Sequence, residues 1–213
     1  MQPFTRLTSP VVPLRRDDVN TDDIIPAQYL KTTAKEGLGQ GLFARWRYRP
    51  DGSPNPDFPL NDPRYGAAQI LLTGANFGSG SSREHAVWAL MQYGFRAVLA
   101  PSFADIFYNN AVQNGLLPAR LAPEAIAELF SWVEAHPGTA VTVDLEAQEV
   151  RLPDGRRFPF DIEPFARTRL LRGMDELDYL LAHLPHIEAY ERAREGEETE
   201  GVAGAEDSAH LRA

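Results

Sequence analysis

The chain has 213 residues, of which 43% are apolar, and a mean hydropathy of −0.34, so it can bury one good core and its length favours one globular domain, with or without a tail. Its 21 basic and 30 acidic side chains give a net charge of −9, which leaves no basic field to hold nucleic acid or an anionic membrane surface. It has no cysteine, which excludes disulfides, thiol nucleophiles and thiolate ligands for an iron-sulfur cluster.

The N-terminus lacks the charged start and apolar run of a signal peptide. No apolar stretch approaches the roughly 20 residues that a membrane-spanning helix needs. We therefore expect a cytoplasmic protein.

Short apolar runs alternate with segments of helical spacing, as is typical of α/β proteins. Between 68 and 114 the order of strand, loop and helix occurs twice, and 149–160 has the turn residues of an antiparallel hairpin. The expected strands are 2–14, 68–73, 97–100, 141–145, 149–152 and 157–160, and the expected helices are 81–91, 103–114, 123–135, 176–183 and 187–194.

Two segments are too irregular for a helix or strand. Residues 49–64 contain five prolines and are long for a structureless loop, which hints at a functional or interface role. Residues 195–213 are rich in Glu, Gly and Ala, so we expect a disordered acidic tail after a domain formed by 1–194.

The strongest local motif is Asn-Phe-Gly-Ser-Gly-Ser-Ser-Arg-Glu-His at 76–85, where a strand leads into a helix. One interpretation is structural, because Ser81 and Glu84 have the spacing of a capping box. Capping does not explain Gly78 and Gly80, which let a backbone approach another group closely, or the cation Arg83 in the first helical turn. An anion bound there would interact favourably with both the helix dipole and the guanidinium, so we favour an anion site.

Nucleotide binding is the competing interpretation of the same glycines. The dinucleotide-binding fingerprint would need a third glycine where this chain has Arg83, and no ribose-binding acid follows at the usual distance. A Walker loop is excluded because Gly-Lys-Ser/Thr is absent.

The motif resembles the signature of the swivelling domain of the aconitase superfamily, and the flanking sequence resembles the isopropylmalate isomerase small subunits within it. Further blocks agree with that family in order, over about residues 1–192: Asp-Val-Asn-Thr-Asp-Asp-Ile-Ile-Pro at 18–26, Gly-Leu-Phe-Ala-Arg-Trp-Arg at 41–47, Pro-Ser-Phe-Ala-Asp-Ile-Phe-Tyr at 101–108 and Asn-Gly-Leu-Leu-Pro at 114–118. The resemblance implies an α/β fold, a swivelling three-layer β/β/α domain. It also implies a hydro-lyase of leucine synthesis, active only with a large subunit that carries a 4Fe-4S cluster, while this chain binds no metal.

Carried over by position, the resemblance implies that Ser81, as its alkoxide, is the catalytic base. Ser82 and Arg83 would hold a carboxylate of a small dicarboxylate substrate. A serine base needs cationic and backbone-donor stabilisation of its anion, and Arg83 is suited to bidentate carboxylate binding. Gly78 and Gly80 would support this loop, together with Glu84.

Other positions matter mainly through the resemblance. Thr21 and Asp22 fall in a block that borders the family's active site, although a solvated Asx turn also accounts for them. Leu30 lies where the family contacts the substrate side chain, and Lys35 is near the position of a substrate-binding arginine; lysine keeps the charge but loses the bidentate fork. His85, next to Ala86 on the helix, is expected to be a buried, hydrogen-bonded structural residue that supports the site.

Two alternatives stay open on the sequence alone. One is a related hydro-lyase small subunit for homoaconitate or citramalate-type acids. The other is a non-catalytic module that binds an anion or a nucleotide by itself.

Overall fold

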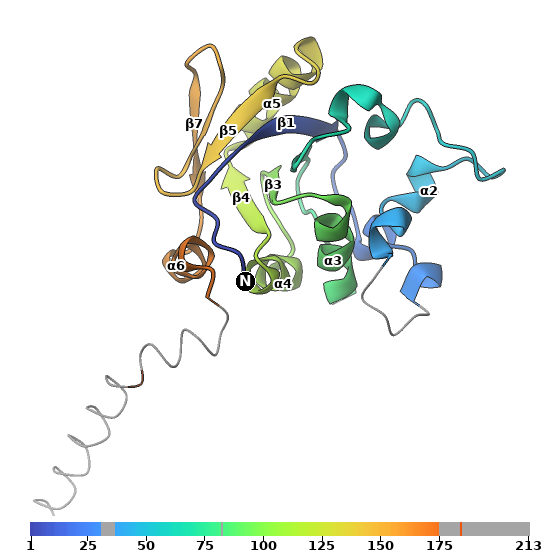
Figure 1. Cartoon of the computed structure of the whole chain (residues 1–213), viewed down its shortest axis with the longest axis horizontal. Helices are drawn as coiled ribbons and strands as arrows, with labels where there is room; N and C mark the ends of the chain where they lie inside the picture. Colours follow the sequence, from blue (N-terminus) through green and yellow to red (C-terminus); the bar gives the residue numbers. More distant parts are fainter. Residues whose placement is uncertain (31–36, 82, 175–183, 185–213) are drawn as a thin grey trace, which may run out of the picture. The chain divides into compact units, whose positions relative to one another are not determined.

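The computed structural model describes residues 1–30, 37–81, 83–174 and 184, and its compact unit is Met1–Gly173 (Figure 1). The remaining residues, Met174–Ala213, form a second unit, of which Met174 and Leu184 are described. The expected helices at 176–183 and 187–194 and the boundary between 194 and 195 lie outside the described residues. They stay predictions.

One long strand joins two sheets into a single curled sheet. β1 pairs with β2 in parallel through its second half, Val11 to Leu14, and with β5 antiparallel through its first half, Arg6 to Pro10. The parallel strands β1 to β4 and the antiparallel strands β5 to β7 thereby close in the order β1-β2-β3-β4-β7-β6-β5. The strands are β1 Arg6–Leu14, β2 Ile70–Thr73, β3 Ala97–Ala100, β4 Leu117–Leu121, β5 Ala140–Asp144, β6 Glu149–Arg151 and β7 Arg157–Asp161.

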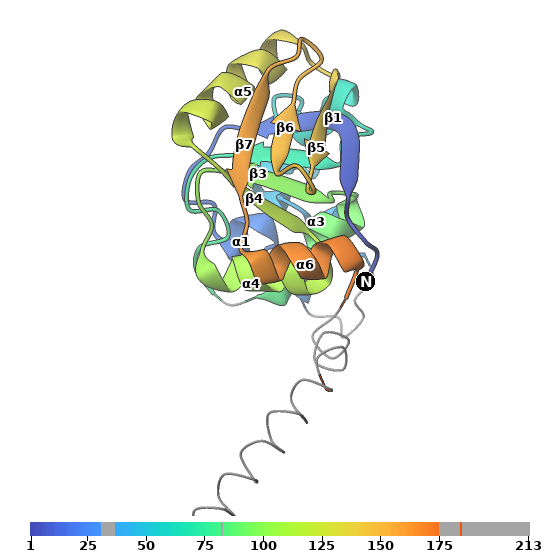
Figure 2. The same cartoon turned by 90° about the vertical axis from the view of Figure 1, so that its left-hand side faces the viewer.

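Helices pack on both sides of the curled sheet. Both views place α5 on the opposite side of the sheet from α4, and Figure 2 shows α4 beside α6. Helix α3 packs against α4, and α5 packs against β1, β2 and β3. The helices are α1 Thr21–Ile24, α2 Ala44–Arg47, α3 Glu84–Tyr93, α4 Asp105–Asn114, α5 Pro123–Ala135 and α6 Pro164–Arg172; the 3-10 turns are η1 Ala27–Leu30, η2 Leu38–Gly41, η3 Pro59–Asn61 and η4 Pro63–Tyr65. The expected three-layer α/β fold is confirmed.

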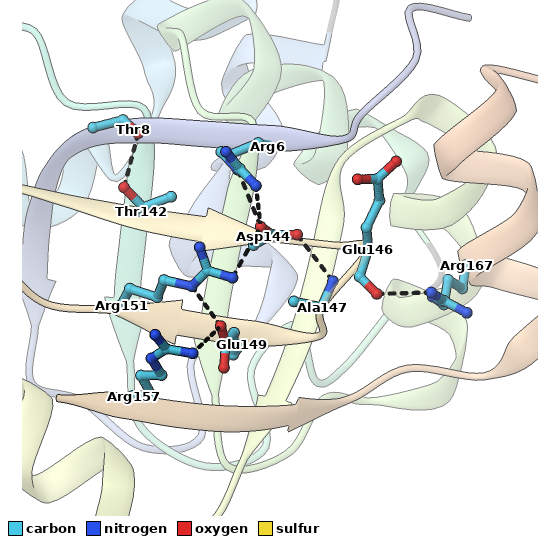
Figure 3. Close-up of polar contacts among 10 residues, drawn as sticks. All are labelled: Arg6, Thr8, Thr142, Asp144, Glu146, Ala147, Glu149, Arg151, Arg157 and Arg167. Carbon is cyan, nitrogen blue, oxygen red and sulfur yellow. Dashed lines mark hydrogen bonds and ion pairs between the residues drawn. The ribbon is translucent and has the colours of Figure 1, made fainter. Parts of the chain in front are cut away.

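The antiparallel strands are cross-linked by charge as well as by backbone pairing (Figure 3). Asp144 on β5, 1% exposed, accepts from Arg6 on β1 at 2.7 Å and pairs with Arg151 on β6 at 3.4 Å. Arg151 also bonds Glu149, which in turn pairs with Arg157 on β7 at 3.6 Å. One buried carboxylate on β5 therefore links the start of β1 to β6.

Two of the described elements that are five residues or longer were missed from the sequence, as were the short helices α1 and α2. β4 has Pro118 in a strand that lies between β3 and β7, and proline normally argues against such a position because it cannot donate to the ladder. α6 has a weak apolar stripe, with buried Ala166 and Leu170 among several arginines. Both depend on neighbours that come from distant parts of the sequence.

Candidate active site

Three loops meet at one edge of the sheet, because β1, β2 and β3 are parallel and their carboxyl ends lie together. The loops follow these strands in turn and are 15–23, which ends in the first turn of α1, 74–83 and 101–104. Bridges join the middle loop to both others, one between Asn20 and Ser79 and one between Phe77 and Phe103. Ligand sites of open α/β sheets commonly lie beyond the carboxyl ends of the strands.

The first two loops are held together along their backbones. The Gly78 amide donates to the Val19 carbonyl at 2.8 Å, and the Thr21 amide donates to the Ser79 carbonyl at 2.8 Å. Asp18 accepts from the Asn76 side-chain amide at 2.8 Å through its own carboxylate. The glycine loop is thus ordered by a loop nearly 60 residues earlier.

The capping box of this region lies in the first loop. Asn20 caps α1: its side chain accepts from the Asp23 amide at 2.9 Å, while the Asp23 carboxylate accepts from the Asn20 amide at 3.3 Å. The alternative interpretation of Ser81 and Glu84 as a capping box is wrong, because α3 begins at Glu84 and its N-cap position has no side-chain hydrogen bond. The expected start of this helix at residue 81 was three residues too early.

Two adjacent residues of the first loop hold both ends of the Ser81–Arg83 segment. The Thr21 hydroxyl donates to the Ser81 carbonyl at 3.0 Å, and Asp22 accepts from the Arg83 guanidinium in an ion pair. Ser81 is exposed, and the Arg83 side chain keeps 25% of its surface accessible. Ser82, which lies between them, is outside the described residues.

Thr21 is 3% exposed, so the solvated Asx turn considered as an alternative is wrong for this residue. A buried threonine hydroxyl needs a partner, and the Ser81 carbonyl supplies it. Asp22 is more accessible, with 41% of its side chain exposed. The Arg83 guanidinium has five N–H donors and uses Nη1 for Asp22, so a further carboxylate can bind at its outer face.

Gly78 and Gly80 are each required for a different structural reason. Gly78 has a φ of +80°, and a Cβ there would lie 2.2 Å from Cγ of Phe107, a buried ring of α4. The close approach at Gly78 is therefore to the core of the protein. Gly80 has a φ of +91° and open surroundings, with Cβ of Asn20 at 3.6 Å, so its conformation alone requires glycine.

Glu84 and His85 face α4 and the rest of α3. The Glu84 carboxylate accepts from the Asn114 side-chain amide at 2.9 Å. His85 is half-buried, less than the full burial expected, and meets the Trp88 ring edge-on with centroids 4.8 Å apart. Both residues support the start of α3 by contacts within the protein.

The two remaining predicted positions are Leu30 and Lys35. Leu30 ends η1 and packs, half-buried, against the core, as an ordinary packing residue also would. Lys35 is outside the described residues. Among the residues that the structure does describe, no cluster of three His, Asp or Glu side chains could hold a metal ion. None of their helices is long and apolar enough to cross a membrane.

Comparison with known proteins matches most of the chain. The family described as the aconitase C-terminal domain matches residues 1–124, and the one described as LeuD_N matches residues 127–164. The 3-isopropylmalate dehydratase small subunit of Roseiflexus sp. (strain RS-1) is 53% identical over 194 residues, covering 91% of this chain and 95% of that protein. The chain belongs to the 3-isopropylmalate dehydratase small-subunit family.

Other members of the family agree. The 3-isopropylmalate dehydratase small subunit of Neisseria meningitidis serogroup C is 50% identical over 203 residues, which cover 91% of this chain and 95% of that protein. A crystal structure of 3-isopropylmalate dehydratase from Methanocaldococcus jannaschii matches with a TM-score of 0.62 and 28% identity, covering 87% of this chain and 99% of that one. The resemblance found in the motifs is confirmed over nearly the whole length.

Sequence reasoning missed three side chains that order this region of the small-subunit fold. Asn20 and Asp23 have capping-box spacing and precede an apolar segment, a signal that was present but assigned to another loop. Asn114 had no such signal, because its partners Glu84 and Trp88 are about 30 residues away and meet it only when α3 and α4 pack.

Proposed function

We propose that this chain is the small subunit of a 3-isopropylmalate dehydratase, which interconverts 2-isopropylmalate and 3-isopropylmalate by dehydration and rehydration in leucine synthesis. Its relatives of this name match over nine-tenths of its length at about half identity. The observation that carries the proposal for the site is the exposed Ser81 held next to Arg83 at the carboxyl edge of the parallel strands.

Ser81 is the base in this proposal. It removes a proton from a substrate carbon in the dehydration direction and returns one in the hydration direction. A serine hydroxyl needs stabilisation of its anion for this task, and the guanidinium of Arg83 and the backbone donors of a glycine loop are groups of the right kind. The bond from Thr21 to the Ser81 carbonyl fixes the backbone that carries the hydroxyl.

Arg83, with Ser82, binds a substrate carboxylate in the same proposal. A guanidinium binds carboxylates through two parallel hydrogen bonds, so its orientation determines where the substrate lies. Asp22 holds one nitrogen of Arg83, which limits the rotation of the guanidinium and leaves its other donors for substrate.

The residues of this chain do not fit a 4Fe-4S cluster, because none of its 213 residues is a cysteine to supply a thiolate. Any cluster in the active enzyme belongs to the large subunit. Proton transfer and carboxylate binding are the roles that we assign to this chain, and it is inactive without its partner.

The test is turnover of the complex reconstituted with the large subunit. Ser81→Ala removes the hydroxyl and leaves the backbone in place, so we expect loss of turnover with unchanged assembly. Ser79→Ala is the matched control on the same loop, and it should retain turnover. Full activity of Ser81→Ala would overturn the role of Ser81 as the base.

Substrate choice is tested on the same complex. In this proposal the apolar Leu30, at the end of η1, contacts the substrate's isopropyl group, whereas the third carboxylate of homoaconitate would favour a cation there. We expect better turnover of isopropylmalate than of homoaconitate or citramalate-type acids. Faster reaction of homoaconitate would reassign the chain to the related hydro-lyases.

The non-catalytic alternative predicts that the isolated chain binds a nucleotide or a simple anion tightly. We expect no such binding in calorimetric titration with ATP or inorganic phosphate. We also propose a cytoplasmic location, which fractionation of the source cells would test.

A further inference from the structure

Asn114 connects the end of α4 to the first turn of α3. Its side-chain amide donates to the Glu84 carboxylate and to the Asn110 carbonyl, both at 2.9 Å. Its side-chain oxygen accepts from the Trp88 indole, also at 2.9 Å. Asn114 is half-buried, so these three bonds fix its orientation in the seam between the two helices.

Without its bond to Asn114, the Glu84 carboxylate would compete with the substrate carboxylate for Arg83. It is the first residue of α3, a helix of ten residues, and it directly follows Arg83. A carboxylate at this place is attracted by the positive end of the helix and by the guanidinium. These are the groups that the proposed function assigns to the substrate carboxylate.

The two side chains point to different neighbours in the structure. Arg83 bonds Asp22 on the first loop, whereas Glu84 bonds Asn114 on α4. The separation leaves Arg83 with one carboxylate partner, Asp22, among the residues that the structure describes. It depends on Asn114, because this residue supplies the side-chain donor that holds Glu84 in the seam.

We propose that Asn114 is a positioning residue that keeps the Glu84 carboxylate out of the anion site and thereby keeps Arg83 available to substrate. The inference rests on the proposed function. The Asn-Gly pair at the end of α4 then has two roles: Gly115, in a left-handed conformation, ends the helix, and Asn114 holds Glu84.

The experiment is a double-mutant cycle on the reconstituted complex, with KM and kcat for isopropylmalate measured separately. Asn114→Ala should raise KM about fivefold, as expected for one added competing ion pair at a partly exposed site, and leave kcat nearly unchanged. Glu84→Gln alone should have little effect, because its side-chain oxygen still accepts from Asn114. Adding Glu84→Gln to Asn114→Ala should restore KM, because the neutral side chain no longer competes.

A second pair of variants distinguishes the proposed role of Asn114 from a folding defect in the alanine variant. Asn114→Asp keeps the shape and the acceptor for Trp88 but opposes the Glu84 carboxylate with a like charge, so KM should rise again. Combining it with Glu84→Gln restores a donor and an acceptor, and KM should fall back. A merely structural role predicts lower thermal stability in the single variants and no rescue of KM in either double variant.

The outcomes separate this inference from the proposed function. If the wild-type complex does not turn over isopropylmalate, the proposed function fails. If the wild type is active but KM is unchanged in both Asn114 variants, or is raised without rescue by Glu84→Gln, the role of Asn114 is overturned and the proposed function stands.

Discussion

The Thr21 hydroxyl donates a hydrogen bond to the Ser81 carbonyl at 3.0 Å, across 60 residues of sequence. The adjacent Asp22 pairs with Arg83, so two neighbouring residues of one loop hold both ends of a three-residue segment on another. The position of the proposed base is therefore set by a loop that follows a different strand.

Removal of the Thr21 hydroxyl should displace Ser81. Thr21→Val keeps the shape of this buried side chain but deletes the donor, at a cost to stability of about 1 kcal/mol. We expect kcat of the reconstituted complex to fall roughly tenfold, because small displacements of a catalytic group are costly. Thr21→Ser, which keeps the hydroxyl, is the control, and equal kcat in the two variants would contradict the role of this bond.

Loss of the Asp22 carboxylate should affect substrate binding more than folding. Asp22→Ala frees the Arg83 guanidinium to rotate, so we expect KM to rise about fivefold while the free energy of unfolding changes by less than about 1 kcal/mol, as is usual for exposed ion pairs. The control is Glu128→Ala on α5, which removes the comparably exposed ion-pair partner of Arg156 and should leave KM unchanged. An unchanged KM in Asp22→Ala would show that Arg83 needs no such orientation.

The glycine loop should tolerate alanine unequally. Gly78→Ala adds a Cβ 2.2 Å from Phe107 in a left-handed conformation, and overpacking together with backbone strain should cost about 3 kcal/mol. Gly80→Ala meets no atom closer than 3.6 Å and bears only the strain, about 1 kcal/mol. Urea unfolding of both variants measures the difference, and equal costs would mean that Phe107 moves aside easily.

The buried Asp144 should make the free energy of unfolding depend on pH in the acid range. Burial alone would raise its pKa, but the Ala147 amide and the Arg6 and Arg151 guanidinium groups outweigh this and hold the pKa of Asp144 below its ordinary value. A lowered folded-state pKa means that the carboxylate contributes its full stability above the unfolded-state pKa, about 3.9. This contribution is lost as the pH falls through the folded-state value.

Asp144→Asn should therefore lower the free energy of unfolding near neutral pH, by about 2 kcal/mol, and flatten its decline in acid. Urea unfolding at a series of pH values between neutral and strongly acidic conditions measures both effects. Asp154→Asn, at an exposed hairpin turn, is the control and should change the decline of the unfolding free energy in acid much less. If the unfolding free energy of Asp144→Asn declines in acid as steeply as that of the wild type, other carboxylates govern acid unfolding.

The sequence by itself determined the local elements and the family. Six strands and three of the described helices were predicted within a few residues, because each has an apolar pattern or turn residues that operate over short distances. The motif at 76–85 and the ordered blocks around it are specific enough to identify the family, because they are contiguous runs of residues and need no contact between distant positions.

Only the tertiary structure decided which of these residues meet. β4 and α6 lack a strong pattern of their own and depend on neighbours supplied by the closed sheet. The same holds for the bonds from Thr21 to Ser81 and from Asn114 to Glu84, and for the contact between Gly78 and Phe107. Such contacts join positions 29 to 60 residues apart, and no local pattern encodes them, because they form only when the parallel strands bring their loops to one edge and α4 packs against α3 and the glycine loop.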